Sequence, residues 1–168
     1  MNVQSIEALV LEGQYSAIVL ALPTAKAAAY KSPADLKGMK IGVTAPGSST
    51  NMFVNILLAK AGLKPDAVSI IGVGAGAGAV AIMKRGEIDA LANLDPVIAQ
   101  LESDGTITPV VDTRTAKGMQ DVYGGAYAAG CIYAPAEWVQ KNPRTTQPRV
   151  NTLVAARRPL PQSRPEPR

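Results

Sequence analysis

Residues 40–62, KIGVTAPGSSTNMFVNILLAKAG, are the stretch that decides the fold. The run 40–43 is typical of a short strand, and the breakers at 44–47 end it. Four residues of the helix N-cap type follow at 48–51. Apolar residues then recur at helical spacing until Gly62, where a helix stop is expected. The sequence therefore predicts a strand, a glycine-bearing loop and a helix, in that order.

The start of this helix is a candidate binding site. The first turn of a helix presents unpaired backbone N–H groups and the positive end of the helix dipole, which suit an anionic or strongly polar group. The candidate ligand-binding residues there are Gly47, Ser48, Ser49, Thr50 and Asn51. A second interpretation is equally supported by these residues alone: one of them caps the helix, and the others are solvated loop.

The composition limits the chemistry. The chain has 168 residues, of which 47% are hydrophobic and 18% charged, enough for one ordinary globular core. It contains one cysteine, Cys131, and no histidine. An internal disulfide, a Ser-His or Cys-His nucleophile pair and the commonest metal ligand are therefore excluded. We expect no catalytic residue, no metal and no cofactor.

The net charge of +4 comes from the end of the chain. Residues 148–168 hold five arginines and one acid, and removing these from the 17 bases and 13 acids leaves twelve of each in residues 1–147. The body of the protein therefore lacks the basic footprint of a nucleic-acid partner. We expect no membrane span, because no apolar run reaches about 18 residues. Residues 1–13 lack the basic start of a signal peptide, so we expect no export signal.

Strand and helix signals alternate along the chain. The predicted strands or extended runs are 6–11 and 15–22, which could pair as a hairpin, then 40–43, 68–73, 88–94, 107–111, 122–125 and 128–134. The predicted helices are 32–38 (one turn), 49–61, 79–84, 95–105 and 134–142, and residues 112–121 are polar and turn-like. This order predicts an α/β fold, a three-layer α/β/α arrangement with a mostly parallel sheet and right-handed crossovers.

Three segments in this order resemble one family. They are SPADLKGMKIGVTAPGSSTN (32–51), AGLKPDAVSIIGVGAGAGAVAIMKRGEIDALANLDPVIAQL (61–101) and YGGAYAAGCIYAPAEWVQKNP (123–143). Together they are similar to the substrate-binding proteins of ABC importers, in the nitrate/sulfonate/taurine branch, which have the type II periplasmic binding fold. The most specific parts are the DLKG–strand–GSS–helix unit, the GEIDA strand and the Asp-Pro step after it.

The resemblance implies a function. Such proteins hold a small polar or anionic solute, for example a sulfonate, nitrate or taurine, in a cleft between two lobes. They pass it to an ABC permease of the inner membrane without chemistry, and the resemblance implies a periplasmic location. It places Ser48 to Thr50 at the polar head of the solute. Asn93 and Asp95 join them, because open α/β sheets bind ligands at the carboxyl ends of strands; Asp95 before Pro96 is also a helix cap.

The resemblance also implies a domain division. Residues 1–31 would be the end of lobe one with hinge strands, 32–121 lobe two, 122–147 the return to lobe one, and 148–168 an irregular tail rich in proline and arginine. Tyr123 and Gly124 would lie near the return and are the last two candidate ligand-binding residues. The missing signal peptide, the missing first half of lobe one and the unusual tail suggest a truncated or mis-predicted reading frame. Exposed sheet edges of such a chain allow a homodimer.

Other interpretations remain. Residues 72–78, GVGAGAG, loosely match the dinucleotide-binding fingerprint, so an NAD-binding enzyme is one alternative, although a tight strand-to-helix turn is favoured. A thiamine-precursor enzyme on a related fold is another, but that family relies on histidine. An inactive fragment is the third. Tyr123 and Tyr127 could stack on a flat ligand or cover a hinge, and Arg114 could meet an anion or face solvent.

Overall fold

The computed structural model describes residues 3–4, 18–125, 127 and 134–156. The chain divides into two compact units, a larger one of residues 15–129 and a smaller one of residues 1–14 and 130–168. The strand at residues 19–23 and the helix at residues 116–123 both belong to the larger unit. The assignment of these units to lobes stays a prediction.

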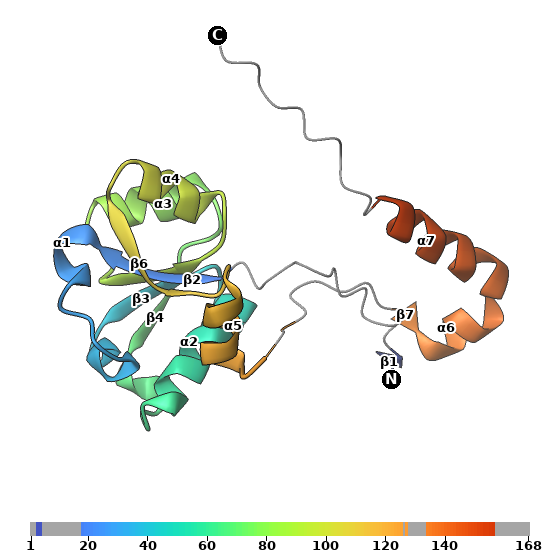
Figure 1. Cartoon of the computed structure of the whole chain (residues 1–168), viewed down its shortest axis with the longest axis horizontal. Coiled ribbons are helices and arrows are strands. Elements are labelled where there is room, and N and C mark those ends of the chain that lie inside the picture. Colours follow the sequence, from blue (N-terminus) through green and yellow to red (C-terminus); the bar gives the residue numbers. More distant parts are fainter. Residues whose placement is uncertain (1–2, 5–17, 126, 128–133, 157–168) are drawn as a thin grey trace, which may run out of the picture. The chain divides into compact units, whose positions relative to one another are not determined.

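A five-stranded sheet forms the centre of the larger unit (Figure 1). In spatial order its strands are β4 (Ser69–Gly72), β3 (Lys40–Val43), β5 (Ala90–Asn93), β2 (Val19–Pro23) and β6 (Ile107–Asp112). β3 pairs in parallel with β4 and β5, whereas β2 pairs antiparallel with β5 and β6. The mostly parallel sheet is confirmed. β2 pairs with these distant strands, and the other strand of the predicted hairpin, 6–11, lies outside the described residues.

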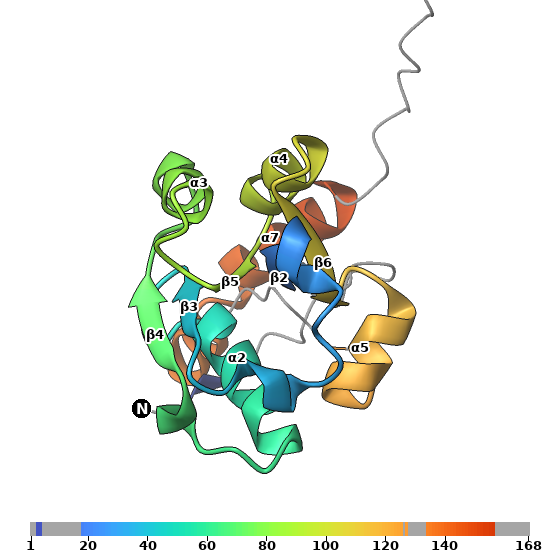
Figure 2. The same ribbon diagram turned by 90° about the vertical axis from the view of Figure 1, so that its left-hand side faces the viewer.

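Helices cover both faces of this sheet. The helices are α1 (Thr24–Ala27), α2 (Ser49–Lys60), α3 (Ala77–Lys84), α4 (Val97–Ser103) and α5 (Ala116–Tyr123), with 3-10 turns η1 (Pro33–Leu36) and η2 (Pro65–Ala67). α2 and α5 lie on one side and α3 and α4 on the other (Figure 2). The predicted three-layer α/β/α arrangement is therefore confirmed.

The two cores follow the alternation of side chains along a strand. In β2, Leu20 and Leu22 pack with the α2 side, while Val19 and Ala21 pack with the α3 and α4 side. Each of these four side chains is at most 2% exposed. A strand buried on both faces reads as a continuous apolar run, which explains why the sequence VLAL carries no polar position.

α5 is a correction to the sequence prediction, which gave a polar turn at 112–121 and an extended run at 122–125. The Thr115 hydroxyl accepts the backbone N–H of Gly118 at 3.0 Å and starts the helix, and Met119 and Val122 are buried. Gly124 ends it in a left-handed conformation, with φ 78°. The prediction failed because the segment is mostly polar on average and because Gly118 and Gly124 are turn signals in a local reading of the sequence.

The smaller unit contains a two-stranded antiparallel sheet and two helices. β1 (Val3–Gln4) pairs with β7 (Ala134–Pro135), and α6 (Ala136–Lys141) precedes α7 (Pro143–Ala156). α6 agrees with the helix predicted there. α7 extends into the tail predicted to be irregular from residue 148: it continues through Pro148, where that prediction is wrong, and covers residues 150–156, where the sequence allows one or two helical turns. The rest of the tail, and most of the predicted run 128–134 with Cys131, lie outside the described residues.

Candidate functional site

Four strand ends meet at one edge of the sheet. β3, β4 and β5 are parallel, so their carboxyl ends lie together. Val19 of β2 pairs with both Asn93 and Asp112, which places the end of β6 at the same edge. The loops after these strands surround what we call the carboxyl edge, and open α/β sheets bind ligands at such an edge.

The loop between β3 and α2 is held by three hydroxyl groups, the hydroxyl cluster of Thr44, Ser48 and Thr50. Their oxygens lie 2.8–3.0 Å from one another. Thr50 is fully buried, and its hydroxyl also accepts the backbone N–H of Thr44 at 2.9 Å. The Ser48 hydroxyl accepts the N–H of Asn51 at 3.4 Å as the cap of α2. The hydroxyls of Ser48 and Thr50 are therefore engaged inside the protein.

Ser49 differs from its neighbours. It is exposed, and it is the first residue of α2. Within the described part of the chain, its hydroxyl, its backbone N–H and the N–H of Thr50 donate to no acceptor, since the cap reaches Asn51 instead. The Asn51 side-chain oxygen accepts the N–H of Gly47 at 2.9 Å and closes the loop. The unsatisfied donors of this site thus come from the first two residues of the helix.

Asn93 and Asp95 lie at the carboxyl edge, as predicted, and both make internal contacts. Asn93 is fully buried; its amide nitrogen donates to the carbonyl of Gly74 at 2.9 Å, and its oxygen accepts the N–H of Leu94 at 2.9 Å. Asp95 is exposed, and its carboxylate accepts the N–H of Ala99, the third residue of α4, at 2.9 Å, so it bonds to the first turn of the helix without being the N-cap residue. Pro96 itself takes the N-cap position, one residue before α4.

The glycine-rich segment 72–78 forms a tight turn between β4 and α3. The N–H of Gly74 donates to the carbonyl of Thr44 at 3.1 Å, and a Cβ on Gly72 would lie 3.1 Å from Pro46 Cδ. Because Asn93 holds the carbonyl of Gly74 as well, the loops after β3, β4 and β5 are fastened to one another. The turn interpretation agrees with this packing.

Tyr123 and Gly124 end α5 beside α2. The Tyr123 ring stacks on Tyr127, with 4.3 Å between ring centroids and 16° between ring planes. Its ring is also 6.5 Å from that of Phe53 in α2. The structure therefore joins the two tyrosines to the helix that starts at the candidate site. Sequence spacing gave no sign of this contact.

A second polar cluster, which sequence analysis missed, lies at the end of β6. The Arg114 guanidinium donates to Asp112 at 2.8–3.2 Å and to Glu102 at 2.8 and 3.2 Å, and lies 3.9 Å from Asp95. We call these four residues the Arg114 cluster. Hydrogen bonds from Arg114 hold the pKa of Asp112 below its usual range, and the two acceptor carboxylates raise the pKa of the guanidinium. The positive charge of Arg114 is therefore compensated by carboxylates within the protein.

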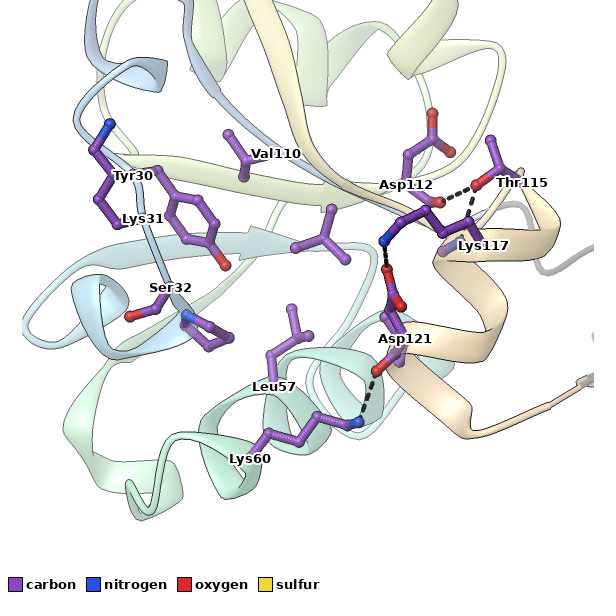
Figure 3. A pocket seen from close by; sticks show the side chains of 14 residues that line it. Tyr30, Lys31, Ser32, Leu57, Lys60, Val110, Asp112, Thr115, Lys117 and Asp121 are labelled. Atoms are coloured by element: carbon purple, nitrogen blue, oxygen red, sulfur yellow. Dashed lines mark hydrogen bonds and ion pairs between the residues drawn. The ribbon is translucent and has the colours of Figure 1, made fainter.

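A cavity of about 490 Å³ lies beside the second half of α2. Figure 3 shows it between α2, α5, β6 and the segment around Tyr30. The Tyr30 hydroxyl is buried with no partner in the described part of the chain, and burial, with the nearby Asp35 carboxylate, raises its pKa to about 12. Lys60 donates to the carbonyl of Asp121 at 2.7 Å. None of the predicted ligand-binding residues lines this cavity.

Two further findings concern the described residues alone. They contain no group of three or more His, Cys, Asp or Glu placed to hold a metal ion. They also contain no helix that combines the length and apolar character needed to span a bilayer.

Comparison with known proteins places the chain in a family. Residues 7–166 match the model of the NMT1-like family. The chain belongs to the NMT1-like family. The solved structure of a protein from Bordetella bronchiseptica RB50 is 52% identical, with a TM-score of 0.78, and the match covers 91% of this chain and 48% of that one. A comparison with curated protein sequences gave no match.

Two further solved structures belong to solute-binding proteins. The periplasmic aliphatic sulphonate-binding protein SsuA from Escherichia coli is 26% identical, with a TM-score of 0.67 over 86% of this chain and 45% of that one. The periplasmic nitrate-binding protein NrtA from Synechocystis PCC 6803 is 19% identical, with a TM-score of 0.59, and the match covers 79% of this chain and 35% of that one. At this identity the comparison supports a shared fold only. The NMT1-like chain spans about half the length, or less, of these relatives and has the type II periplasmic binding fold they share.

Proposed function

We propose that this NMT1-like chain is part of the solute-binding component of an ABC importer and holds a small polar or anionic solute at the carboxyl edge. Family membership and the 26% identity to an aliphatic sulphonate-binding protein support this class of function. In this proposal the solute is a sulfonate, nitrate, taurine or similar molecule. The partner is an ABC permease of the inner membrane, and the location is the periplasm.

The unsatisfied donors at the start of α2 carry the proposal. An oxyanion accepts several hydrogen bonds, and the hydroxyl and N–H of Ser49 with the N–H of Thr50 supply three donors at the positive end of a twelve-residue helix. The hydroxyls of Ser48 and Thr50 fix the loop, so they act as positioning groups in this proposal. Asn93 acts in the same way, by fastening the neighbouring loop.

A charge placed at Ser49 tests the site. We expect ethanesulfonate, taurine or nitrate to raise the melting temperature of the wild-type chain, because a ligand that binds the folded state stabilises it. Ser49→Asp should lower the affinity at least about tenfold, because a carboxylate repels the anion. The same carboxylate in the first helical turn is favourable to α2 by about 0.3–1 kcal/mol, so the ligand-free protein should not melt earlier.

Ser69→Asp is the matched control. Ser69 is exposed and begins β4, at the end of the sheet opposite the carboxyl edge, so the same charge change there should leave the affinity unaltered. Equal loss of binding in both variants would show that net charge, not the start of α2, determines affinity. Absence of a melting shift with all three probes would contradict solute binding by this chain.

A further inference from the structure

The cavity of about 490 Å³ beside α2, which we call the Tyr30 cavity, lies away from the start of that helix. Its lining comes from four parts of the larger unit: the segment 30–33, the last turn of α2, the end of β6 and α5. Small-molecule sites in proteins occupy about 300–1,000 Å³ and combine apolar walls with a few polar groups. The volume of the Tyr30 cavity therefore suits a small molecule.

Much of the cavity lining is apolar. Leu57 of α2 and Val122 of α5 are buried, at 2% and 3% exposure, and Val110 and Val111 of β6 pack against the same core. Apolar side chains that border an open space lack dispersion contacts on that side, and a bound apolar group would supply them. The lining therefore favours a ligand with an apolar body.

The Tyr30 hydroxyl needs an acceptor. Its oxygen is buried, and it has no hydrogen-bond partner in the described part of the chain, which costs free energy. It keeps its proton at neutral pH, because its pKa is raised to about 12. Figure 3 shows the Tyr30 ring among the lining side chains, with the hydroxyl directed inward. A ligand oxygen would satisfy this donor after a small movement of the ring, since the hydroxyl oxygen is covered in the ligand-free protein.

Lys60 lies across the lining from Tyr30 (Figure 3). Its ammonium group donates to the backbone carbonyl of Asp121 at 2.7 Å, whereas the Asp121 carboxylate pairs with Lys117. Among the described residues, Lys60 forms no ion pair with a carboxylate. An ammonium group has three donors, so Lys60 can still donate to an anion in the cavity. A carboxylate is a suitable acceptor, because charge-assisted hydrogen bonds are stronger than neutral ones.

We infer that the Tyr30 cavity binds a small amphipathic carboxylate. Its head accepts from Lys60, its apolar body lies against Leu57 and Val110, and an oxygen at its far end accepts from the Tyr30 hydroxyl. Medium-chain carboxylates with a terminal hydroxyl or carbonyl group have this chemistry. The site is separate from the start of α2 and does not depend on the proposed function.

Two carboxylates of equal chain length test the site by calorimetric titration of the full chain. We expect 8-hydroxyoctanoate to bind roughly 2- to 10-fold more tightly than octanoate, the range that one hydrogen bond supplies. Tyr30→Phe should remove this preference and leave the affinity for octanoate unchanged. It should not lower the melting temperature of the ligand-free protein, because the hydroxyl has no bond to lose. Lys60→Met should weaken the binding of both carboxylates about tenfold or more.

Lys64→Met is the matched control for Lys60→Met, because Lys64 is exposed, carries the same charge and does not line the cavity. Equal losses in these two variants would overturn the inference, since net charge would then explain the affinity. Failure of both carboxylates to bind overturns it too, as does a preference for 8-hydroxyoctanoate that persists in Tyr30→Phe. Octanoate binding that survives Ser49→Asp supports a separate site. Octanoate binding without any response to ethanesulfonate would contradict the proposed function alone.

Discussion

The hydroxyl cluster and the Arg114 cluster lie at the same edge of one sheet, yet they differ in what they leave available. Arg114 carries a full positive charge, but Asp112 and Glu102 accept its hydrogen bonds. The start of α2 carries no charged side chain, and the cap of Ser48 bypasses the donors of Ser49 and Thr50. In the proposed function an anion therefore binds where donors lack acceptors, and the charged residue in the sequence does not mark that place.

The largest effect on stability is expected beside the Arg114 cluster, where α5 packs closely against the end of β6. A Cβ at Gly118 would lie 1.7 Å from the carbonyl oxygen of Asp112. We expect Gly118→Ala to lower the free energy of unfolding by about 3 kcal/mol or more, since backbone must move and the helix propensity gained is only about 1 kcal/mol. Urea denaturation measures this effect. Gly125→Ala is the control, because nothing lies within 4 Å of a Cβ there; equal losses would contradict the steric explanation.

The next effect tests whether Arg114 is structural. Arg114→Met leaves two carboxylates without their shared partner, and we expect a loss of about 1–2 kcal/mol, between the values for exposed and buried pairs. Lys117→Met removes the exposed pair with Asp121 and should cost less than about 0.5 kcal/mol. Chemical denaturation compares the two. Anion affinity should survive Arg114→Met; its loss would show that Arg114 belongs to the binding site.

The hydroxyl cluster gives a smaller effect on stability. Thr50→Val removes the acceptor of the Thr44 N–H from a fully buried position, which should cost about 1–1.5 kcal/mol. Thr50→Ser keeps the hydroxyl and should cost less. The two variants are compared by thermal unfolding and by titration with ethanesulfonate. If Thr50→Ser were the more damaging of the two, packing of the methyl group would matter more than the hydrogen bonds.

The smallest effect is a dependence on pH. Asp112 has a lowered pKa in the folded protein because Arg114 donates to it, so its stabilising contribution is fully present above the unfolded value of about 3.9. That contribution is lost as the pH falls through the lower folded pKa. Stability measured from about pH 5 downward should therefore fall more steeply in the wild type than in Arg114→Met. Parallel curves would contradict the coupling of this pair.

Much of the fold could be predicted from local sequence. The strand 40–43 and the helix after it follow from a β-branched run, breakers and N-cap residues, and the structure places them within two residues of the expected bounds. α5 escaped detection because Gly118 is required by its close approach to the end of β6, a contact that no local pattern reveals. The continuation of α7 through Pro148 likewise contradicts local propensity.

The position of the candidate site could be predicted from the sequence better than the roles of its individual residues. Residues of the N-cap type predict a helix start, but which hydroxyl turns inward depends on Thr44, which no cap pattern includes. Asn93 bonds to a neighbouring loop, a partner 19 residues away in sequence that no local pattern reveals, and its expected role toward a ligand stays a prediction. The aromatic contact of Phe53 with Tyr123 joins residues from separate helices, so no periodicity reveals it.

The reversed direction of β2 has a mechanical consequence. The polypeptide enters the sheet through Ile18, whose carbonyl accepts both the backbone N–H and the hydroxyl of the buried Thr113, at 3.2 and 2.7 Å. The next residue, Val19, pairs with Asn93 of β5 and with Asp112 of β6 at the carboxyl edge. A pulling force on the chain before Ile18 therefore acts first on the strand pairs that end at Asn93 and Asp112. The force would reach the carboxyl edge without passing through the hydrophobic core.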